Sequence, residues 1–345
     1  MLQQILAKYM DESTSTSKGG FFKISLMLKG AAMGVAEVIP GVSGGTIAFI
    51  TGIYEDLINS IKSVDQYVIS DILKFRISKV WKAVNGPFLL NLIIGMVIGL
   101  LAGIVGVTKL LHSEPEILWA LFFGLIVGSI PLMFSIIKKK SAFNVIPFIV
   151  SAIAAYLITS ISPAEGSTNL FYIFIAGIIA ISAFVLPGIS GSFILLLMGL
   201  YTVIIPTIKS FLESPELSEF ILLSVFALGC LIGLALFSRL VSAAFKNYHD
   251  LTIAIMSGFM FGSLNKIWPW RNPTEILNKS DQSVTLVNDS NISTIDVMAD
   301  DIKIIDESNV LPEAYFSDPQ TTYVIIAFIV GILIVAGLAI VQKKK

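Results

Sequence analysis

Two hexapeptides decide the fold of this chain, PGVSGG at residues 40–45 and PGISGS at residues 187–192. The first interrupts the apolar stretch 24–58 and the second interrupts the apolar stretch 170–208. Each stretch is roughly twice the length of about 20 residues that a membrane-spanning helix needs. Proline removes a backbone donor and glycine tolerates left-handed dihedrals, so each hexapeptide should break a helix. Each stretch is therefore predicted to be a helix, a break and a second helix.

The hexapeptides belong to a longer internal repeat with a shift of 147 residues. Nine positions are identical at this shift, where Gly30, Ala36, Pro40, Gly41, Ser43, Gly44, Ile47, Gly52 and Tyr54 correspond to Gly177, Ala183, Pro187, Gly188, Ser190, Gly191, Ile194, Gly199 and Tyr201. A weaker echo follows, in which Gly124, Gly128 and Ser129 have the same spacing as Gly258, Gly262 and Ser263. The sequence therefore predicts two related halves, residues 20–161 and 162–341.

The composition is typical of an all-α polytopic membrane protein. Of the 345 residues, 55% are hydrophobic and 14% are charged, and the mean hydropathy is +0.85, whereas soluble proteins average about 25% charged residues. The near balance of 23 basic and 24 acidic residues gives no basic field for nucleic acid. Each half is predicted to hold one broken element followed by three transmembrane helices, at 88–111, 117–137 and 143–161, and at 219–237, 251–267 and 322–341.

The placement of Lys and Arg predicts that both broken elements are re-entrant hairpins. If each returns to the face it entered, the basic residues before residue 24 and at 60–86, 138–140, 239–246 and 343–345 all lie in the cytoplasm, as the positive-inside rule requires. The segments on the extracytoplasmic side are then 162–169 and 268–320, and the second of these has three basic and ten acidic residues. Three spans separate the hairpins, so they would enter from opposite faces. This is an inverted repeat, which is typical of secondary transporters.

The same reasoning predicts how the chain is divided. A cytoplasmic amphipathic segment, 1–19, precedes the first transmembrane repeat, 20–161, and the second repeat, 162–341, contains an acidic extracytoplasmic insert at 268–320. Residues 342–345 form a cytoplasmic tail. Both termini are thus predicted to be cytoplasmic, in a multi-pass protein of the cytoplasmic (inner) membrane. The insert is expected to be solvated, with short alternations such as 283–286 that suit β structure.

The two breaks form the predicted binding site, because irregular backbone at membrane depth is tolerated only where it is buried in protein or lines a polar cavity. Glycine N–H groups and hydroxyls at such turns suit an anion such as phosphate or carboxylate. Glu37 is the carboxylate inside the first broken element, and it is predicted to bind substrate or a coupling proton or sodium ion. The candidate substrate-binding residues are Lys29, Glu37, Pro40, Gly41, Ser43, Gly44, Gly45 and Thr46, with Pro187, Gly188, Ser190, Gly191, Ser192 and Arg239.

Structural readings of the same residues remain open at this point. The glycines also suit tight turns and close helix packing, as do the Gly-x-x-x-Gly spacings at 95–103, 124–128, 229–233 and 258–262. Glu37 also suits an ion pair with Lys29, and both Lys29 and Arg239 suit ordinary snorkelling to the membrane surface.

Enzyme functions are disfavoured. The GISG sequence at 188–191 resembles the nucleophile motif of intramembrane serine proteases, which also need an activating histidine on a neighbouring helix. His249 is expected at the start of a helix, and the same Gly-x-Ser-Gly spacing recurs at 41–44, which suits a repeated turn. A lipid phosphatase would need clustered Arg, His and Asp along the pathway. The single cysteine, Cys230, excludes a Cys-based zinc site, so no catalytic residue, metal or cofactor is predicted.

The run KGAAMGVAEVIPGVSGGT at 29–46, followed by GIYEDLI at 52–58, resembles the signature of the polyprenyl-phosphate transporter family called PopT. The sequence LPGISGS at 186–192 and the stretch 258–270 are similar to the same family, whereas the acidic residues 271–320 exceed its pattern. The resemblance implies a translocase that returns undecaprenyl phosphate, a lipid carrier of cell-envelope synthesis, from the outer to the inner leaflet. The alternatives are a transporter of a small anion and a membrane scaffold that transports nothing. The oligomeric state is left open.

Overall fold

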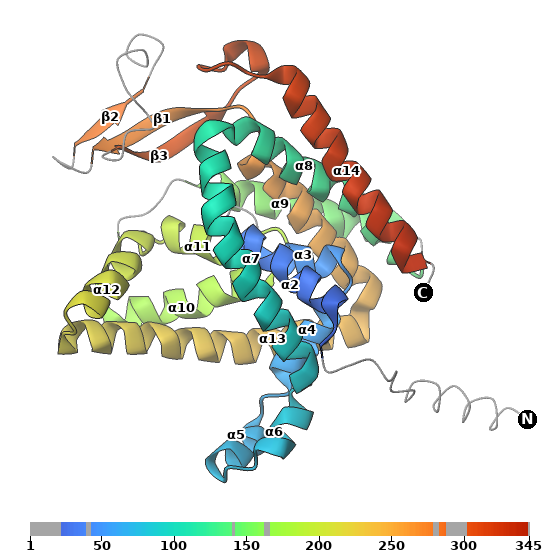
Figure 1. The fold of residues 1–345 in the computed structure, drawn as a ribbon, viewed down its shortest axis with the longest axis vertical. Helices are drawn as coiled ribbons and strands as arrows, with labels where there is room; N and C mark the ends of the chain where they lie inside the picture. Colours follow the sequence, from blue (N-terminus) through green and yellow to red (C-terminus); the bar gives the residue numbers. More distant parts are fainter. Residues whose placement is uncertain are drawn as a thin grey trace, which may run out of the picture.

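A computed structural model describes residues 22–38, 43–139, 142–161, 166–278, 283–287 and 302–343 of the chain (Figure 1). In the first half its α-helices are α2 Ile24–Glu37, α3 Gly44–Ile50, α4 Tyr54–Lys62, α5 Gln66–Leu73, α6 Ile77–Ala83, α7 Gly86–Ser113, α8 Pro115–Ile136 and α9 Val145–Thr159. In the second half they are α10 Leu170–Val185, α11 Gly191–Leu197, α12 Tyr201–Glu213, α13 Leu217–Ser263 and α14 Thr321–Lys343. Short 3-10 turns are η1 Ala142–Asn144, η2 Leu264–Ile267 and η4 Pro312–Ala314.

The structure confirms a mostly helical membrane protein. In the described part of the chain, three helical segments are long and apolar enough to cross a membrane: Gly86–Gly106, Pro115–Ile136 and Leu217–Ile267. Three shorter apolar helices accompany them, Val145–Thr159, Leu170–Val185 and Thr321–Gly337.

The helix α13 differs from the sequence prediction. The basic segment 239–246, predicted to be a turn between two spans, is helical, and the break falls instead at Tyr248, where φ is −138° and ψ is 48°. Neither glycine nor proline occurs between Gly233 and Gly258. No glycine or proline ends the helix within 239–246, so it continues through the charged residues as far as the break at Tyr248.

Both predicted helix breaks are present, and each is followed by a second break that was not predicted. The helix α2 ends at Glu37 and α3 begins at Gly44, while α10 ends at Val185 and α11 begins at Gly191. The short helices α3 and α11 then end at turns with left-handed glycines, Gly52 with φ +71° and Gly199 with φ +67°. These glycines correspond to each other in the repeat, so each broken element has three helical parts.

The first helix of each half packs along the first long span of that half in an equivalent way. The helix α2 packs along α7, and α10 packs along α13. A Cβ atom placed on Gly30 would lie 2.3 Å from the carbonyl oxygen of Leu92, and one placed on Gly177 would lie 2.6 Å from that of Phe226. Gly30 and Gly177 are repeat equivalents, so the two halves use the same position for close backbone approach.

The remaining spans repeat this correspondence. The helix α8 packs along α14, and α13 packs along α9. A Cβ atom on Gly124 would lie 2.1 Å from the carbonyl oxygen of Phe328, and one on Gly258 would lie 2.3 Å from that of Phe148. The Gly-x-x-x-Gly positions therefore pack helices closely, as the spacing predicted.

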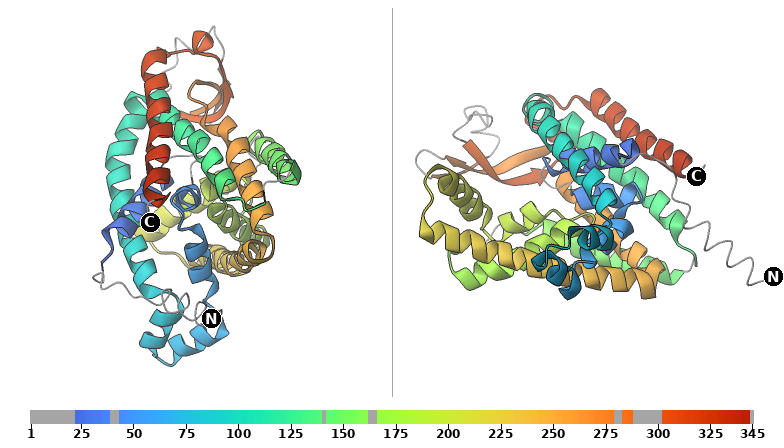
Figure 2. Two further views of the ribbon diagram at one scale, coloured as in Figure 1. Left: turned by 90° about the vertical axis from the view of Figure 1, so that its right-hand side faces the viewer. Right: turned by 60° about the horizontal axis from the view of Figure 1, so that its bottom comes forward.

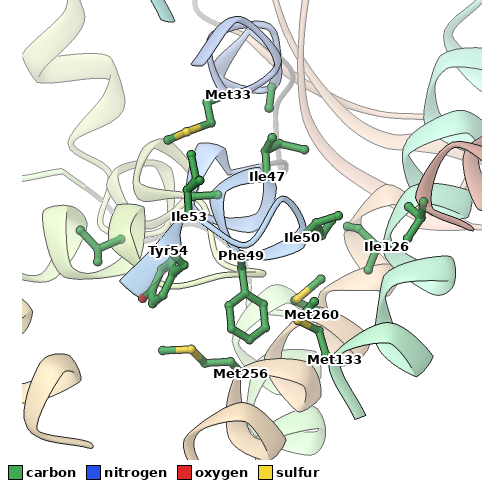
Figure 3. Packing of buried hydrophobic residues seen from close by; sticks show 14 of the residues in the cluster. Met33, Ile47, Phe49, Ile50, Ile53, Tyr54, Ile126, Met133, Met256 and Met260 are labelled. Carbon is green, nitrogen blue, oxygen red and sulfur yellow. The ribbon is translucent and has the colours of Figure 1, made fainter. Parts of the chain in front are cut away.

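The buried core lies where α3 meets α8 and α13. Phe49 of α3, Met133 of α8 and Met256 and Met260 of α13 belong to one cluster of buried side chains, and Figure 3 shows Phe49 between the two methionines of α13. Since Phe49 follows the first break by only a few residues, this packing sets the position of that break in the bundle.

The acidic insert contains an antiparallel sheet in the order β2-β1-β3, formed by β1 Arg271–Asn278, β2 Val284–Leu286 and β3 Ile302–Asn309. Figure 1 shows it at one end of the helical bundle. Two indole groups connect it to neighbouring backbone, because Trp268 Nε1 donates to Val310 O and Trp270 Nε1 donates to Pro319 O, each at 2.8 Å.

Candidate functional site

The two breaks, which are far apart in the sequence, are in direct contact. The backbone N–H of Gly188 donates to Thr46 Oγ1 at 2.9 Å, and both groups are buried. Ser43 Oγ donates to the carbonyl oxygen of Phe184 at 3.1 Å. A Cβ atom on Gly45 would lie 2.8 Å from the carbonyl oxygen of Val185. Residues of the two predicted half-sites therefore form one site.

The local structure of the first break follows from Ser43. This residue precedes α3, and its Oγ accepts the N–H of Gly45 at 3.1 Å, which satisfies one of the free donors at the start of the helix. Its hydroxyl hydrogen is then available for Phe184. A single serine thus caps α3 and connects the first break to the end of α10.

The second break depends on a glycine at its turn. Gly188 has a φ of +91°, and a Cβ atom there would lie 2.7 Å from Met260 N, so a side chain is excluded by both backbone conformation and space. Ser190 Oγ is hydrogen bonded to Ser192 Oγ at 2.8 Å. Ser190 is buried whereas Ser192 is exposed, which makes this hydroxyl pair the reachable part of the second break.

Glu37 lies over the start of α3. Its Oε1 accepts the backbone N–H of Gly44 at 2.7 Å, a charge-assisted hydrogen bond when the carboxylate is ionised. The equivalent residue in the second half is Phe184, and a Cβ atom on Gly191 would lie 2.9 Å from the Phe184 Cβ. The two halves therefore share a backbone arrangement but differ in charge, with a carboxylate in one and a phenyl ring in the other.

The two cations among the candidate residues, Lys29 on α2 and Arg239 on α13, have hydrogen-bond partners away from the two breaks. Lys29 Nζ donates to the carbonyl oxygen of Thr51 at 2.6 Å, at the end of α3. Arg239 donates to the carbonyl oxygens of Ala235 at 2.7 Å and Val64 at 3.2 Å, which connects α13 to the chain beyond α4. Roles for Lys29 and Arg239 in substrate binding stay predictions.

Other candidates differ in how far the structure describes them. Pro40 and Gly41 lie outside the described residues. Pro187 and Gly191 are buried at the second break. Among the described residues, no group of three or more His, Cys, Asp or Glu side chains is placed to hold a metal ion.

An open apolar groove of about 630 Å³ is a feature that sequence reasoning missed. Its walls come from α8, α9, α13 and the turn η2, and include Phe123, Val127, Ile153, Tyr156, Phe261 and Leu264. The side chains of Ile153 and Tyr156 are 54% and 51% exposed. These residues are far apart in the sequence, and each is of a type that also faces lipid in a membrane helix. The periodicity of apolar residues therefore could not predict the groove.

Two of the residues that line this groove are asparagines joined by a hydrogen bond. Asn309 Nδ2 donates to Asn265 Oδ1 at 2.8 Å, and Asn265 Nδ2 donates to Ser160 Oγ at 3.4 Å. Both asparagines line the groove. The groove therefore combines apolar walls with two amide side chains, a lining that is compatible with an amphipathic ligand.

The fold and the site define a helical membrane protein in which two glycine-rich helix breaks meet and in which an open apolar groove lies between α8, α9 and α13. The chain belongs to the VCA0040-like family, described as undecaprenyl phosphate translocase-like, whose sequence profile matches residues 33–285. This confirms the resemblance of residues 29–58 and 186–192.

Two relatives are both named polyprenyl-phosphate transporter. The one from Vibrio cholerae serotype O1 is 39% identical over 265 residues, which cover 76% of this chain and 84% of the relative. The one from Staphylococcus aureus is 32% identical over 269 residues, covering 74% and 89%. No solved structure matches the chain. The family and relatives are transporters, so this chain is a transporter rather than an enzyme.

Proposed function

We propose that this protein transports a polyprenyl phosphate, undecaprenyl phosphate in particular, from the outer to the inner leaflet of the cytoplasmic membrane for reuse in cell-envelope synthesis. The names of the family and of both relatives support the substrate class. The observation that carries the proposal is the open apolar groove between α8, α9 and α13. A lipid carrier needs a lateral opening for its hydrocarbon chain, whereas a transporter of a small anion needs a closed, hydrated path.

The headgroup would cross at the two meeting breaks. Moving an unpaired charge through an apolar medium costs many kcal/mol, while the prenyl chain can remain in lipid. Ser192 is the exposed hydroxyl at this site. The N–H groups of Gly44 and Gly188 are hydrogen bonded to Glu37 and Thr46. A phosphate would therefore bind by replacing these internal acceptors.

Glu37 would couple this exchange to an ion. Its carboxylate accepts the Gly44 N–H that a phosphate oxygen would use. Protonation, or binding of sodium, would weaken that hydrogen bond and reduce the repulsion between Glu37 and an incoming phosphate. A gradient of the coupling ion would then drive the headgroup across.

The two halves would act as an inverted repeat whose hairpins enter from opposite faces, with both termini in the cytoplasm. The equivalent packing of Gly30 on α7 and Gly177 on α13 supports this symmetry. The distribution of Lys and Arg supports the orientation. Alternating exposure of the meeting breaks to each leaflet would follow from rocking of one half against the other.

The test is leaflet-resolved uptake of undecaprenyl phosphate by proteoliposomes under an imposed pH or sodium gradient. The wild-type protein should move the lipid, and the effective gradient identifies the ion. Glu37→Gln should lose the response to the gradient, whereas Asp56→Asn, which removes an exposed carboxylate from α4, should retain it. Uptake of a small anion without lipid would refute the substrate assignment. Absence of any transport by a folded protein would favour a scaffold.

A further inference from the structure

The segment between the first broken element and α7 has a surface that the transport site does not use. It folds into two short helices, α5 and α6, joined by a turn at residues 74–76. Figure 1 and the left view of Figure 2 show both helices projecting beyond the rest of the bundle. Phe75 lies in this turn with a φ of +54°, an uncommon conformation for a residue with a large side chain.

Large apolar side chains dominate the surface of this segment. Tyr67 is 72% exposed, Leu73 is 75% exposed, Phe75 is 86% exposed and Ile77 is 65% exposed. Val68 is the buried residue of α5. Several large exposed apolar side chains on one short segment favour contact with lipid or with another protein.

Basic residues lie among these apolar side chains. Lys74, Lys79 and Lys82 are exposed, and none of them forms an ion pair with another described residue. The nearby carboxylates are already used, since Asp65 accepts the N–H groups of Tyr67 and Val68 at the start of α5, and Asp71 pairs with Arg76 at 3.3 Å. The segment therefore presents positive charge beside apolar groups.

We propose that α5 and α6 lie in the headgroup region of the bilayer, with Phe75 and its apolar neighbours inserted and the lysines bound to anionic lipid. The charge decides this occupant, because a surface rich in lysine complements anionic headgroups, and aromatic and aliphatic side chains favour the interface beneath them. The proposed topology places this segment at the cytoplasmic leaflet; that assignment rests on the proposed function, whereas insertion itself does not. A surface partly covered by a second copy of the chain is the competing arrangement.

This contact would hold the exit of the first broken element at the membrane surface. The helix α4 connects that element to α5, and α4 is hydrogen bonded to α13 through Asn59 and Ser242 at 2.9 Å and through Lys62 and Ser242 at 3.0 Å. Anchoring α5 and α6 would therefore fix the depth of α4 and α13 together while other helices move.

The experiment places an environment-sensitive fluorophore on Phe75→Cys in a Cys230→Ser background, with the full chain in nanodiscs. A label on Glu313→Cys, an exposed residue beyond the sheet, provides the aqueous control. Two quenchers are compared, aqueous iodide and doxyl-labelled lipid, in phosphatidylcholine with and without phosphatidylglycerol. Leu73→Cys supplies a second position if Phe75→Cys is poorly folded by size-exclusion chromatography.

Iodide quenching at Phe75 should be lower than at Glu313 by on the order of threefold or more, and doxyl lipid should quench Phe75 strongly, because the interface excludes aqueous ions. Phosphatidylglycerol should increase the doxyl quenching at Phe75, and replacing Lys74, Lys79 and Lys82 by Glu should remove this increase. Equal iodide quenching at both positions would overturn the proposal. Protection from iodide without doxyl quenching would also overturn it and assign the surface to protein contact. Uptake of the lipid substrate is measured separately, so failure here does not depend on failure of transport.

Discussion

The contact between the two breaks can be tested by replacing Thr46 with valine, which has nearly the same shape but lacks the hydroxyl. Thr46 is 1% exposed, and its Oγ1 is the acceptor for the buried N–H of Gly188 at 2.9 Å. Valine leaves this N–H without a partner and out of reach of water. A buried donor left unsatisfied costs about 1–3 kcal/mol.

The matched control is Thr46→Ser, which keeps the hydroxyl and removes one buried methyl group. That change should cost about 0.8 kcal/mol through lost apolar burial. Valine should therefore destabilise the protein more than serine, although valine is the more hydrophobic residue. At a cost of one to two kcal/mol, the ratio of folded to unfolded protein falls by a factor of about 5–30.

The measurement is the free energy of unfolding from denaturing-detergent titrations of wild type and both variants, followed by helical content. The same variants are then assayed for uptake of undecaprenyl phosphate. If Thr46→Val is as stable as wild type, or if Thr46→Ser has the lower free energy of unfolding of the two variants, the hydrogen bond between Thr46 and Gly188 does not hold the two breaks together.

Three further predictions concern other groups of the site and the insert. Gly188→Ala should lower the free energy of unfolding by about 2–5 kcal/mol in the same titration, because of backbone strain at its φ of +91° and overpacking against α13. The control is Gly106→Ala, where the new Cβ has open space. This change should be neutral or stabilising by up to about 1 kcal/mol. Glu37→Gln should give uptake rates independent of external pH or sodium, measured in proteoliposomes, and a retained gradient response would exclude Glu37 as the coupling group. Burial, aided by the charge of Glu116, raises the pKa of Tyr315 to about 12 from an ordinary value of 10.0. The contribution of this group to stability is therefore complete below pH 10 and is lost as pH rises through about 12. In an ultraviolet absorbance titration, the ionisation near pH 12 should be absent from Tyr315→Phe.

Several features of the fold could be predicted because they depend on local chemistry. The apolar lengths and the glycine and proline positions predicted membrane helices and both breaks, since backbone donors and left-handed dihedrals are properties of single residues. The second breaks at Gly52 and Gly199 were missed, although both glycines are in the repeat, because an isolated glycine is tolerated within a helix. The turn predicted at 239–246 was wrong, because charged residues do not by themselves interrupt helical hydrogen bonding and the helix continues to the break at Tyr248.

By itself the sequence determined a polytopic helical protein with two related halves, a broken element in each, and an acidic insert. These follow from hydropathy, breaker residues and repetition, which do not require knowledge of distant contacts. The tertiary structure decided that Thr46 meets Gly188, that Glu37 binds the N–H of Gly44, and that three helices enclose a groove. Such contacts depend on how α3, α10 and α13 pack, and packing is a property of the whole chain because each position is set by neighbours remote in sequence.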